Sequence, residues 1–273
     1  SGQEEMLKPK RYLPGSAALS AHPGALACAG EVCVSPEDGA LFIQIQIKNE
    51  GGAEAHVRAT CDAAVALDDE RDERAHPVFR QMFVESARPR RWAVQFRRRP
   101  RSEGEAMPAL LLMANAPGAL EAETALDARI DRSGALHPLT GTVGSPLNPC
   151  AALSAEFVLP AGAQAEMHFA LGFAEDAEAW LERNYPESAP QRAQELSGMQ
   201  TRAMIAFLGI DARRRRLLDR AIALLVNPRL NEKNEGAQGS CPRSALWAAG
   251  VSGEDAILLM RVHARGELSR VRE

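Results

Sequence analysis

Between residues 41 and 48, Ile43, Ile45 and Ile47 alternate with polar side chains. Successive side chains of a β-strand point to opposite faces of the sheet, so this period of two predicts a strand with one buried face and one solvated face. The turn residues 49–52, Asn-Glu-Gly-Gly, follow directly. We therefore expect residues 56–67 to return as the partner strand of a hairpin.

Other apolar segments are bounded by turn residues in the same way. They are Ala109–Ala114, Leu153–Leu159 and Ala165–Phe173, the last two joined by Pro160-Ala161-Gly162. In this second pair, Phe157 and Leu159 are expected to meet Met167, Phe169 and Leu171 in a core. Short strands joined by Gly, Pro and Asn turns are typical of an antiparallel β-sandwich. Residues 1–31, rich in Ala, Gly and Pro, are expected to form an arm with one edge strand.

After residue 174 the pattern becomes helical. Helices are predicted at Glu175–Asn184, from about Pro190 to Leu208, and at Ala212–Val226. Trp180 and Leu181 mark one face of the first helix, and apolar residues recur at helical spacing in the second. The fold class predicted is mainly β with α: an antiparallel β-sandwich at 1–174, linker helices at 175–230, and a loop with a further segment at 231–273.

Net charge is modest, at −4, so the composition does not indicate a nucleic-acid or anionic-membrane binder overall. The strongest local exception is residues 88–101, where seven arginines are interleaved with Trp92 and Phe96. Binding of nucleic acid or polyphosphate there is the alternative function. The competing interpretation is a strand at 92–97 whose Val94 and Phe96 point inward between charged ends.

Five cysteines, odd in number and without a CxxC pair, predict a reduced, cytoplasmic chain with no metal site and no cofactor. No apolar stretch is long enough for a transmembrane helix, and prolines interrupt the N-terminal segment that most resembles a secretory signal. His76 precedes Pro77, which disfavours a helical backbone at His76 and favours a structural role for it. The apolar residues that follow, Phe79 and Met82–Val84, are expected to pack under the sheet.

A site-like loop lies near the C-terminus, from Ser244 to Ile257. It contains Trp247, Gly250, Ser252, Gly253 and Glu254. Glycines allow close approach of a ligand, an indole face suits a sugar ring, and a carboxylate accepts paired hydroxyl hydrogen bonds. These residues are the predicted substrate-binding site. The simpler interpretation is a turn that precedes a buried strand.

This loop resembles the "LW-x-x-GISGD-x-PI" segment of glycoside hydrolase family 94, which holds cellobiose phosphorylase, chitobiose phosphorylase and the cyclic β-1,2-glucan synthases. Two further segments are similar in the same order. Residues 75–85, AHPVFRQMFVE, resemble "AHPAF-x-x-LFVET" and are followed by the arginine run 97–101; residues 147–153, LNPCAAL, resemble "LDPC-x-x-L".

The resemblance implies a large N-terminal β-sandwich of the galactose-mutarotase-like, supersandwich kind, then linker helices and the start of an (α/α)6 barrel that carries the chemistry. It implies transfer of a glucosyl group to phosphate or to a glucan, with phosphate as co-substrate only in a phosphorylase. Where the phosphorylases have a sugar-binding arginine and aspartate, this chain has Ala248 and Glu254. The chain is thus expected to be a diverged, truncated module without catalytic residues of its own. The expected partners are a β-linked glucan or gluco-oligosaccharide and a second copy or a separate barrel chain, with an exposed apolar surface near Leu217, Leu218 and 256–262.

Overall fold

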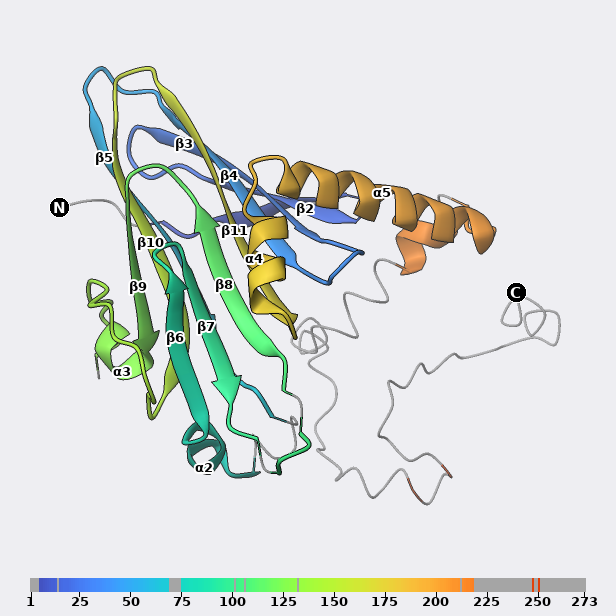
Figure 1. Cartoon of the computed structure of the whole chain (residues 1–273). Helices are drawn as coiled ribbons and strands as arrows, with labels where there is room; N and C mark the ends of the chain where they lie inside the picture. The colour runs from blue at the N-terminus through green and yellow to red at the C-terminus, as the bar shows by residue number, and fades with distance from the viewer. Residues whose placement is uncertain are drawn as a thin grey trace. The chain divides into compact units, whose positions relative to one another are not determined.

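The computed structural model describes residues 5–218, except 14, 69–74, 101, 106, 132 and 212, together with Trp247 and Gly250. The chain divides into two compact units, Ser1–Met204 and Ile205–Glu273. The first unit contains two antiparallel sheets and the helices that follow them (Figure 1). The fold class predicted from the sequence is confirmed, whereas the domain boundaries at 174 and 230 stay a prediction.

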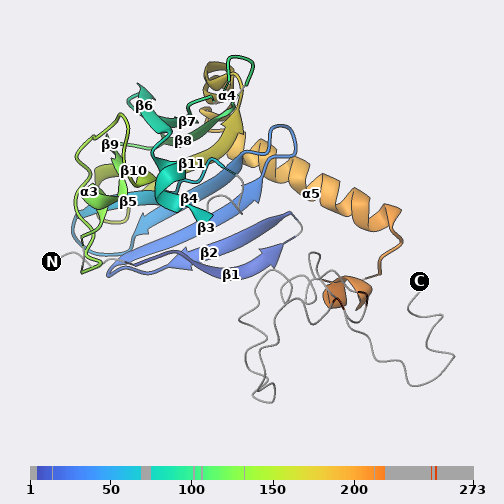
Figure 2. The same cartoon turned by 90° about the horizontal axis from the view of Figure 1, so that it is seen from below.

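The larger sheet has eight strands. In spatial order they are β1 (Lys8–Leu13), β2 (Ser16–Ala21), β3 (Leu26–Val34), β4 (Leu41–Asn49), β11 (Gln164–Ala174), β8 (Ala109–Asn115), β7 (Ala93–Arg98) and β6 (Val84–Arg90). The smaller sheet has the order β5 (Ala55–Ala64), β10 (Pro149–Leu159) and β9 (Ala119–Ala125). Figure 2 shows the large sheet curving from β1 to β6 around the small sheet. The helices are α2 (Pro77–Gln81), α3 (Leu126–Arg129), α4 (Ala177–Asn184) and α5 (Ala189–Phe207), and residues 213–218 are also helical.

The main core lies between the two sheets. Ile45 and Ile47 of β4 face it, as their alternation predicts, and Ile43 packs against it. The predicted contact between the last two strands is also present, because Phe157, Leu159, Met167 and Phe169 belong to this cluster. These strands nevertheless lie in different sheets. Residues 160–163 carry the chain across the sandwich instead of closing a hairpin.

A second core lies on the opposite face of the large sheet, where α4 runs beside β8 and β11 (Figure 1). The apolar run of β8 is buried on both faces: Leu112 faces the small sheet, and Leu111 faces the helices. Trp180 and Leu181 of α4 are 3% and 1% exposed, which confirms the predicted buried face of that helix. Gly172 of β11 makes room for the indole, because a Cβ at this position would lie 2.9 Å from Trp180.

The predicted hairpin of residues 41–67 is wrong. Strand β5 forms but pairs with β10 in the other sheet, because both edges of β4 are occupied by β3 and β11. Asn49, 1% exposed, holds the crossing together. Its Nδ2 donates to the carbonyls of Ala53 at 2.8 Å and Leu159 at 2.9 Å, and its Oδ1 accepts from the Gly51 amide at 2.9 Å.

The N-terminal segment is more ordered than expected. In place of an arm with one edge strand, residues 8–34 contribute β1, β2 and β3 to the large sheet. The side chains of β2, Ser-Ala-Ala-Leu-Ser-Ala, are small and mostly half-buried, so they produce no clear hydrophobic period. Backbone pairing with β3 in continuous register determines this part of the sheet instead.

The apolar residues around α2 do not pack under the sheet, apart from Val84, which is 1% exposed and opens β6. Phe79, Met82 and Phe83 are exposed, and the two phenylalanine rings contact each other edge to face at 5.2 Å. The chain enters the sheet only at Val84, so the preceding side chains do not reach the core. His76 at the helix start has φ −144° and ψ 60°, a non-helical backbone as the following proline predicts.

The predicted second helix is present as α5, but its buried positions differ from its apolar ones. Pro190, Ala193, Ser197 and Gly198 are its buried residues, whereas Phe207 is 89% exposed. No helix among the described residues has the length and apolarity needed to cross a bilayer. Cytoplasmic placement stays a prediction.

Candidate functional site

The predicted sugar-binding loop is described at two of its five residues. Trp247 is 67% exposed, and Gly250 has φ +74° and donates its amide hydrogen to the Trp247 carbonyl at 3.0 Å. A Cβ at Gly250 would meet no atom within 4 Å, so the positive φ, not a lack of space, favours glycine there. Ser252, Gly253 and Glu254 lie outside the described residues, and their role in binding stays a prediction.

The arginine-rich segment 88–101 forms parts of β6 and β7. Strand β7 carries Val94 and Phe96 into the core at 0% exposure, which confirms the strand interpretation of residues 92–97. Four of the arginines are engaged with neighbouring groups: Arg88 with the Leu120 carbonyl, Arg90 with Glu178, Arg98 with Glu105 and Arg99 with Glu85. Three of these partners are carboxylates, so three of the seven guanidinium charges of the segment are paired within the molecule. This pairing disfavours the segment as a nucleic-acid or polyphosphate site.

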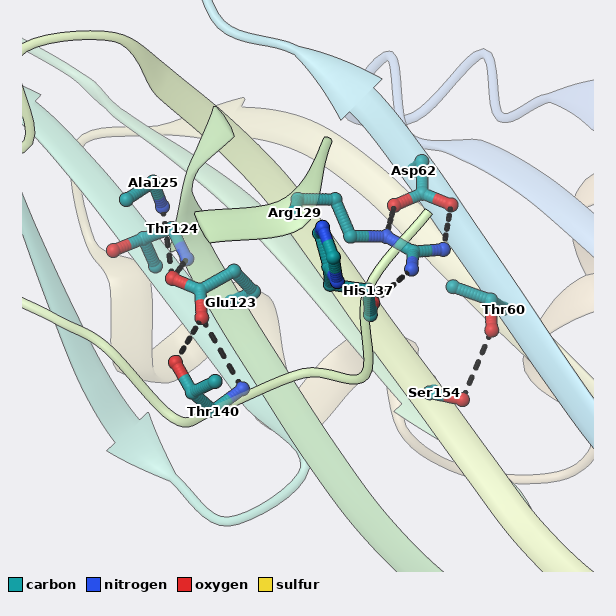
Figure 3. A network of polar contacts seen from close by, with 9 residues as sticks. All are labelled: Thr60, Asp62, Glu123, Thr124, Ala125, Arg129, His137, Thr140 and Ser154. Atoms are coloured by element: carbon teal, nitrogen blue, oxygen red, sulfur yellow. Dashed lines mark hydrogen bonds and ion pairs between the residues drawn. The ribbon is translucent and has the colours of Figure 1, made fainter. Parts of the chain in front are cut away.

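A polar network covers the outer face of the small sheet and is drawn in Figure 3. The Arg129 guanidinium reaches from α3 to Asp62 on β5, with Nε to Oδ1 at 2.9 Å and Nη2 to Oδ2 at 3.1 Å. Its Nη1 donates to the His137 carbonyl at 2.5 Å. Arg129 is 7% exposed, so this two-point ion pair fixes α3 and the following loop against the sheet.

Beside it, Glu123 of β9 is a fully buried carboxylate. Its Oε1 accepts from the amides of Thr124 at 2.9 Å and Ala125 at 3.0 Å (Figure 3). Its Oε2 accepts from the Thr140 amide at 3.2 Å and hydroxyl at 2.6 Å. Burial alone would raise the pKa of this carboxyl, but the hydrogen bonds from Thr140, Ala125 and Thr124 outweigh it and hold the pKa below its ordinary value.

Glu123 is therefore held as an anion whose oxygens are already occupied by donors. A general acid for glycoside cleavage needs the opposite arrangement, with a raised pKa and a proton available to the glycosidic oxygen. In this environment Glu123 tethers the loop of Thr140 to β9. No motif or spacing in the sequence singles out Glu123, Asp62 or Arg129. The only local signal was the alternation of 119–125, which places Leu120 and Ala122 toward the core and the glutamates on the other face.

The described cysteines, Cys28, Cys33, Cys61 and Cys150, are free thiols. Burial, with a smaller contribution from the neighbouring Asp62, raises the pKa of Cys61 to about 12. Burial and then the charge of Glu123 raise the pKa of Cys150 to about 12. Thiols in this state are protonated at neutral pH and are poor nucleophiles or metal ligands.

Comparisons with known proteins give distant structural similarities and one family match. No curated protein matches the chain. Among solved structures, the chain is similar to a polysaccharide lyase, at 14% identity and TM-score 0.36 over 64% of this chain and 23% of that one. It is also similar to a Synechocystis sp. PCC 6803 protein, at 6% identity and TM-score 0.36 over 63% of this chain and 66% of that one. A third similar structure, from the human microbiome and assigned as a kojibiose phosphorylase, has 6% identity and TM-score 0.38 over 70% of this chain and 23% of that one.

The chain spans less than two thirds of each of these structures, and at such TM-scores the similarity carries no argument about fold or function. The family match is more informative. Residues 10–184 match the family described as glycosyl hydrolase 94, supersandwich domain. This range includes α4 and both sheets, apart from the first two residues of β1. Two of the three segments that carried the family resemblance, residues 75–85 and 147–153, lie inside this match, whereas the Ser244–Ile257 loop lies outside it. The chain belongs to the glycosyl hydrolase 94 supersandwich domain family.

Proposed function

We propose that the chain is a non-catalytic module of a carbohydrate-active enzyme that contacts a β-linked glucan, while another part of that enzyme breaks and forms the glycosidic bond. The observation that carries this proposal is the supersandwich match over residues 10–184. The resemblance of residues 75–85 and 147–153 to β-glucan phosphorylases and cyclic β-1,2-glucan synthases supports a glucan as the sugar. Inorganic phosphate enters only if the enzyme is a phosphorylase.

The chemistry of the sandwich supports a non-catalytic role. Glycosyl transfer by the usual route requires a carboxylic acid that protonates the leaving oxygen, next to a nucleophile or base on the other side of the sugar. The buried carboxylate Glu123 has a lowered pKa and four hydrogen-bond donors. Asp62 is occupied by Arg129. Both carboxylates hold loops in place, and the lowered pKa of Glu123 leaves it without a proton to give at neutral pH.

We propose that the sugar contact is the loop of Trp247, Gly250, Ser252, Gly253 and Glu254. The exposed indole of Trp247 offers a flat face to a pyranose ring. The Glu254 carboxylate can accept hydrogen bonds from two neighbouring hydroxyls. A carboxylate one methylene longer than the family's aspartate, and an alanine in place of the arginine, favour weak binding by the isolated chain.

A protein partner is part of the same proposal. Leu217 and Leu218 are 60% and 45% exposed, which suits contact with a second copy or with a separate catalytic chain. The alternative function, nucleic-acid binding through residues 88–101, is less well supported because Arg90, Arg98 and Arg99 are ion-paired. If that alternative held, affinity for single-stranded DNA would fall steeply with added salt, because neutralised phosphates release counterions.

A phosphorolysis assay tests the non-catalytic proposal. The chain is incubated with phosphate and a β-1,2- or β-1,4-linked glucose disaccharide, and glucose 1-phosphate is measured over time. We expect no release above the enzyme-free control, since the proposal assigns the general acid to another part of the enzyme. Sustained release that survives purification to homogeneity would overturn the proposal.

A further inference from the structure

A hollow of about 290 Å³ lies between the β3–β4 turn and the junction of α4 with α5, within the first compact unit. One wall is the turn around Ser35 and Glu37. The other wall is the helical junction from Arg183 to Ala193. None of its residues belongs to the loop proposed above as the sugar contact, so it is a separate feature of the molecule.

Side chains from both walls hold the hollow in shape. Arg192 of α5 binds Glu37 in a two-point ion pair, with Nη2 to Oε1 at 2.6 Å and Nε to Oε2 at 3.0 Å. Asn184 at the end of α4 donates from Nδ2 to Asp38 at 3.0 Å. Arg183 lies 3.8 Å from the same carboxylate. The walls are therefore fixed before any ligand enters, which reduces the ordering cost of binding.

The lining is apolar at its base and polar at its rim. Phe42 is 1% exposed and Ala193 is 3% exposed, and both line the hollow. The rim carries the Glu37 carboxylate and the guanidinium groups of Arg183 and Arg192. Such a combination of an apolar base with a few convergent polar groups is typical of small-molecule sites.

The charges of the rim select the class of ligand. Arg192 is paired with Glu37, and Arg183 is next to Asp38, so the two positive charges are balanced by two negative ones. A free anion would meet the Glu37 carboxylate, and a fully apolar ligand would leave the charged groups desolvated without a partner. A neutral ring with several hydroxyl groups can instead accept from a guanidinium and donate to the adjacent carboxylate.

We propose that this hollow binds one neutral pyranose unit, as a sugar site remote in sequence from the Trp247–Glu254 loop. The volume of about 290 Å³ is just below the range of about 300–1,000 Å³ for ligand pockets, which suits a single ring and not an oligosaccharide. This inference rests on the proposed carbohydrate-binding function. It adds a second set of residues, none of them in the loop, with which the module holds a glucan.

The test is a titration of the full chain, with ¹³C-labelled alanine methyl groups, against methyl β-D-glucopyranoside. Ala189 and Ala193 line the hollow and report on it directly. We expect saturable shifts at these two methyls. Replacing the half-buried Ala189 by leucine fills the hollow and should weaken binding by more than about tenfold, since added methylenes exclude the ring. Ala179→Leu is the matched control, an exposed alanine on α4 outside the lining, and should leave the affinity unchanged.

Arg192→Gln is a second variant, which removes the ion pair with Glu37 without adding volume. If Ala189→Leu fails to fold, the affinity of Arg192→Gln for the glucoside tests the proposal instead. Equal affinity in the wild type and in the folded hollow variants would overturn the proposal, as would shifts at Ala189 and Ala193 with inorganic phosphate but not with the glucoside. Failure of the loop proposal is distinguishable, because Glu254→Ala should alter binding of oligosaccharides and leave the shifts at Ala189 intact. Oligosaccharide binding with no glucoside binding at the hollow would overturn this inference alone.

Discussion

Replacing Glu123 by glutamine tests whether this carboxylate is a structural anion. The glutamine oxygen can keep the position of Oε1 and accept from the amides of Thr124 and Ala125. The new NH2 group then points at Thr140. The Thr140 hydroxyl can rotate to accept from it, but the Thr140 amide, now 3.2 Å from Oε2, would face a donor instead of an acceptor. The Thr140 amide thus loses its acceptor, and a neutral group replaces the fully buried charged acceptor.

The expected loss follows from the hydrogen bonds that depend on the negative charge of Glu123. Hydrogen bonds to a charged acceptor contribute about 1.5–3 kcal/mol each. We therefore expect Glu123→Gln to lower the free energy of unfolding by about 2 kcal/mol at pH 7, read from the midpoint of urea unfolding with an unchanged m-value. Glu121→Gln is the control: it lies on the same strand, and its residue is exposed. Its effect should stay within about 0.5 kcal/mol.

The difference in the free energy of unfolding between the wild type and Glu123→Gln should depend on pH in a defined direction. The pKa of Glu123 is lowered in the folded chain, so the carboxylate stabilises the fold above the unfolded-state pKa, about 4.3 for glutamate. That contribution is lost as the pH falls through the folded-state pKa. The difference between wild type and Glu123→Gln should therefore be largest at neutral pH and shrink below about pH 4. A difference that grows on acidification would refute the assignment of Glu123 as a stabilised anion, and so would a stability gain in the variant at pH 7.

Three further substitutions test the packing of the sandwich. Asn49→Ala leaves the carbonyls and amide of the β4–β5 crossing without their partner, and should lower the free energy of unfolding by about 2–3 kcal/mol in urea unfolding. Gly118→Ala should prevent folding or lower the free energy of unfolding by more than about 3 kcal/mol, because the φ of Gly118 is +81° and a Cβ would lie 2.0 Å from a carbonyl oxygen of β10. We expect this variant to be insoluble or to lack fixed tertiary structure. A thermal melt by circular dichroism that matches the wild type would count against this expectation. Gly172→Ala should lower the free energy of unfolding by about 1–3 kcal/mol and change Trp180 fluorescence, since the new methyl group displaces the indole. Gly52→Ala is the control for both glycine variants, because a Cβ at Gly52 would meet open space.

Much of the sandwich was predictable from local patterns. The alternation at Ile43–Ile47 placed one face of β4 in the core, and the apolar positions 94 and 96 placed β7 there despite the arginines around them. The helix face of Trp180 and Leu181 was equally clear, because large apolar residues fixed it. In these segments, side-chain burial and local periodicity agree, which is the condition under which sequence patterns predict structure well.

Strand pairing and the polar site were not predictable in the same way. The turn at 49–52 looks like a hairpin turn, but whether β5 joins β4 or β10 depends on which edges distant strands already occupy. Likewise, Asp62 and Arg129 are 67 residues apart, and only the folded sandwich brings them together. The exposed phenylalanines at 79 and 83 show that an apolar side chain alone does not establish burial. Their apolar rings predict a place in the core, but the position of α2 before β6 leaves them at the surface.

The most direct test of the central claim is a calorimetric titration of the chain with β-1,2- and β-1,4-linked gluco-oligosaccharides, with and without phosphate, in parallel with Glu254→Ala. We expect weak, saturable binding that the Glu254→Ala substitution reduces. We also expect the oligosaccharide recovered from the calorimeter cell to show no hydrolysis or phosphorolysis. The absence of heat with every glucan, or binding that is unchanged in Glu254→Ala, would contradict the role assigned to the Trp247–Glu254 loop.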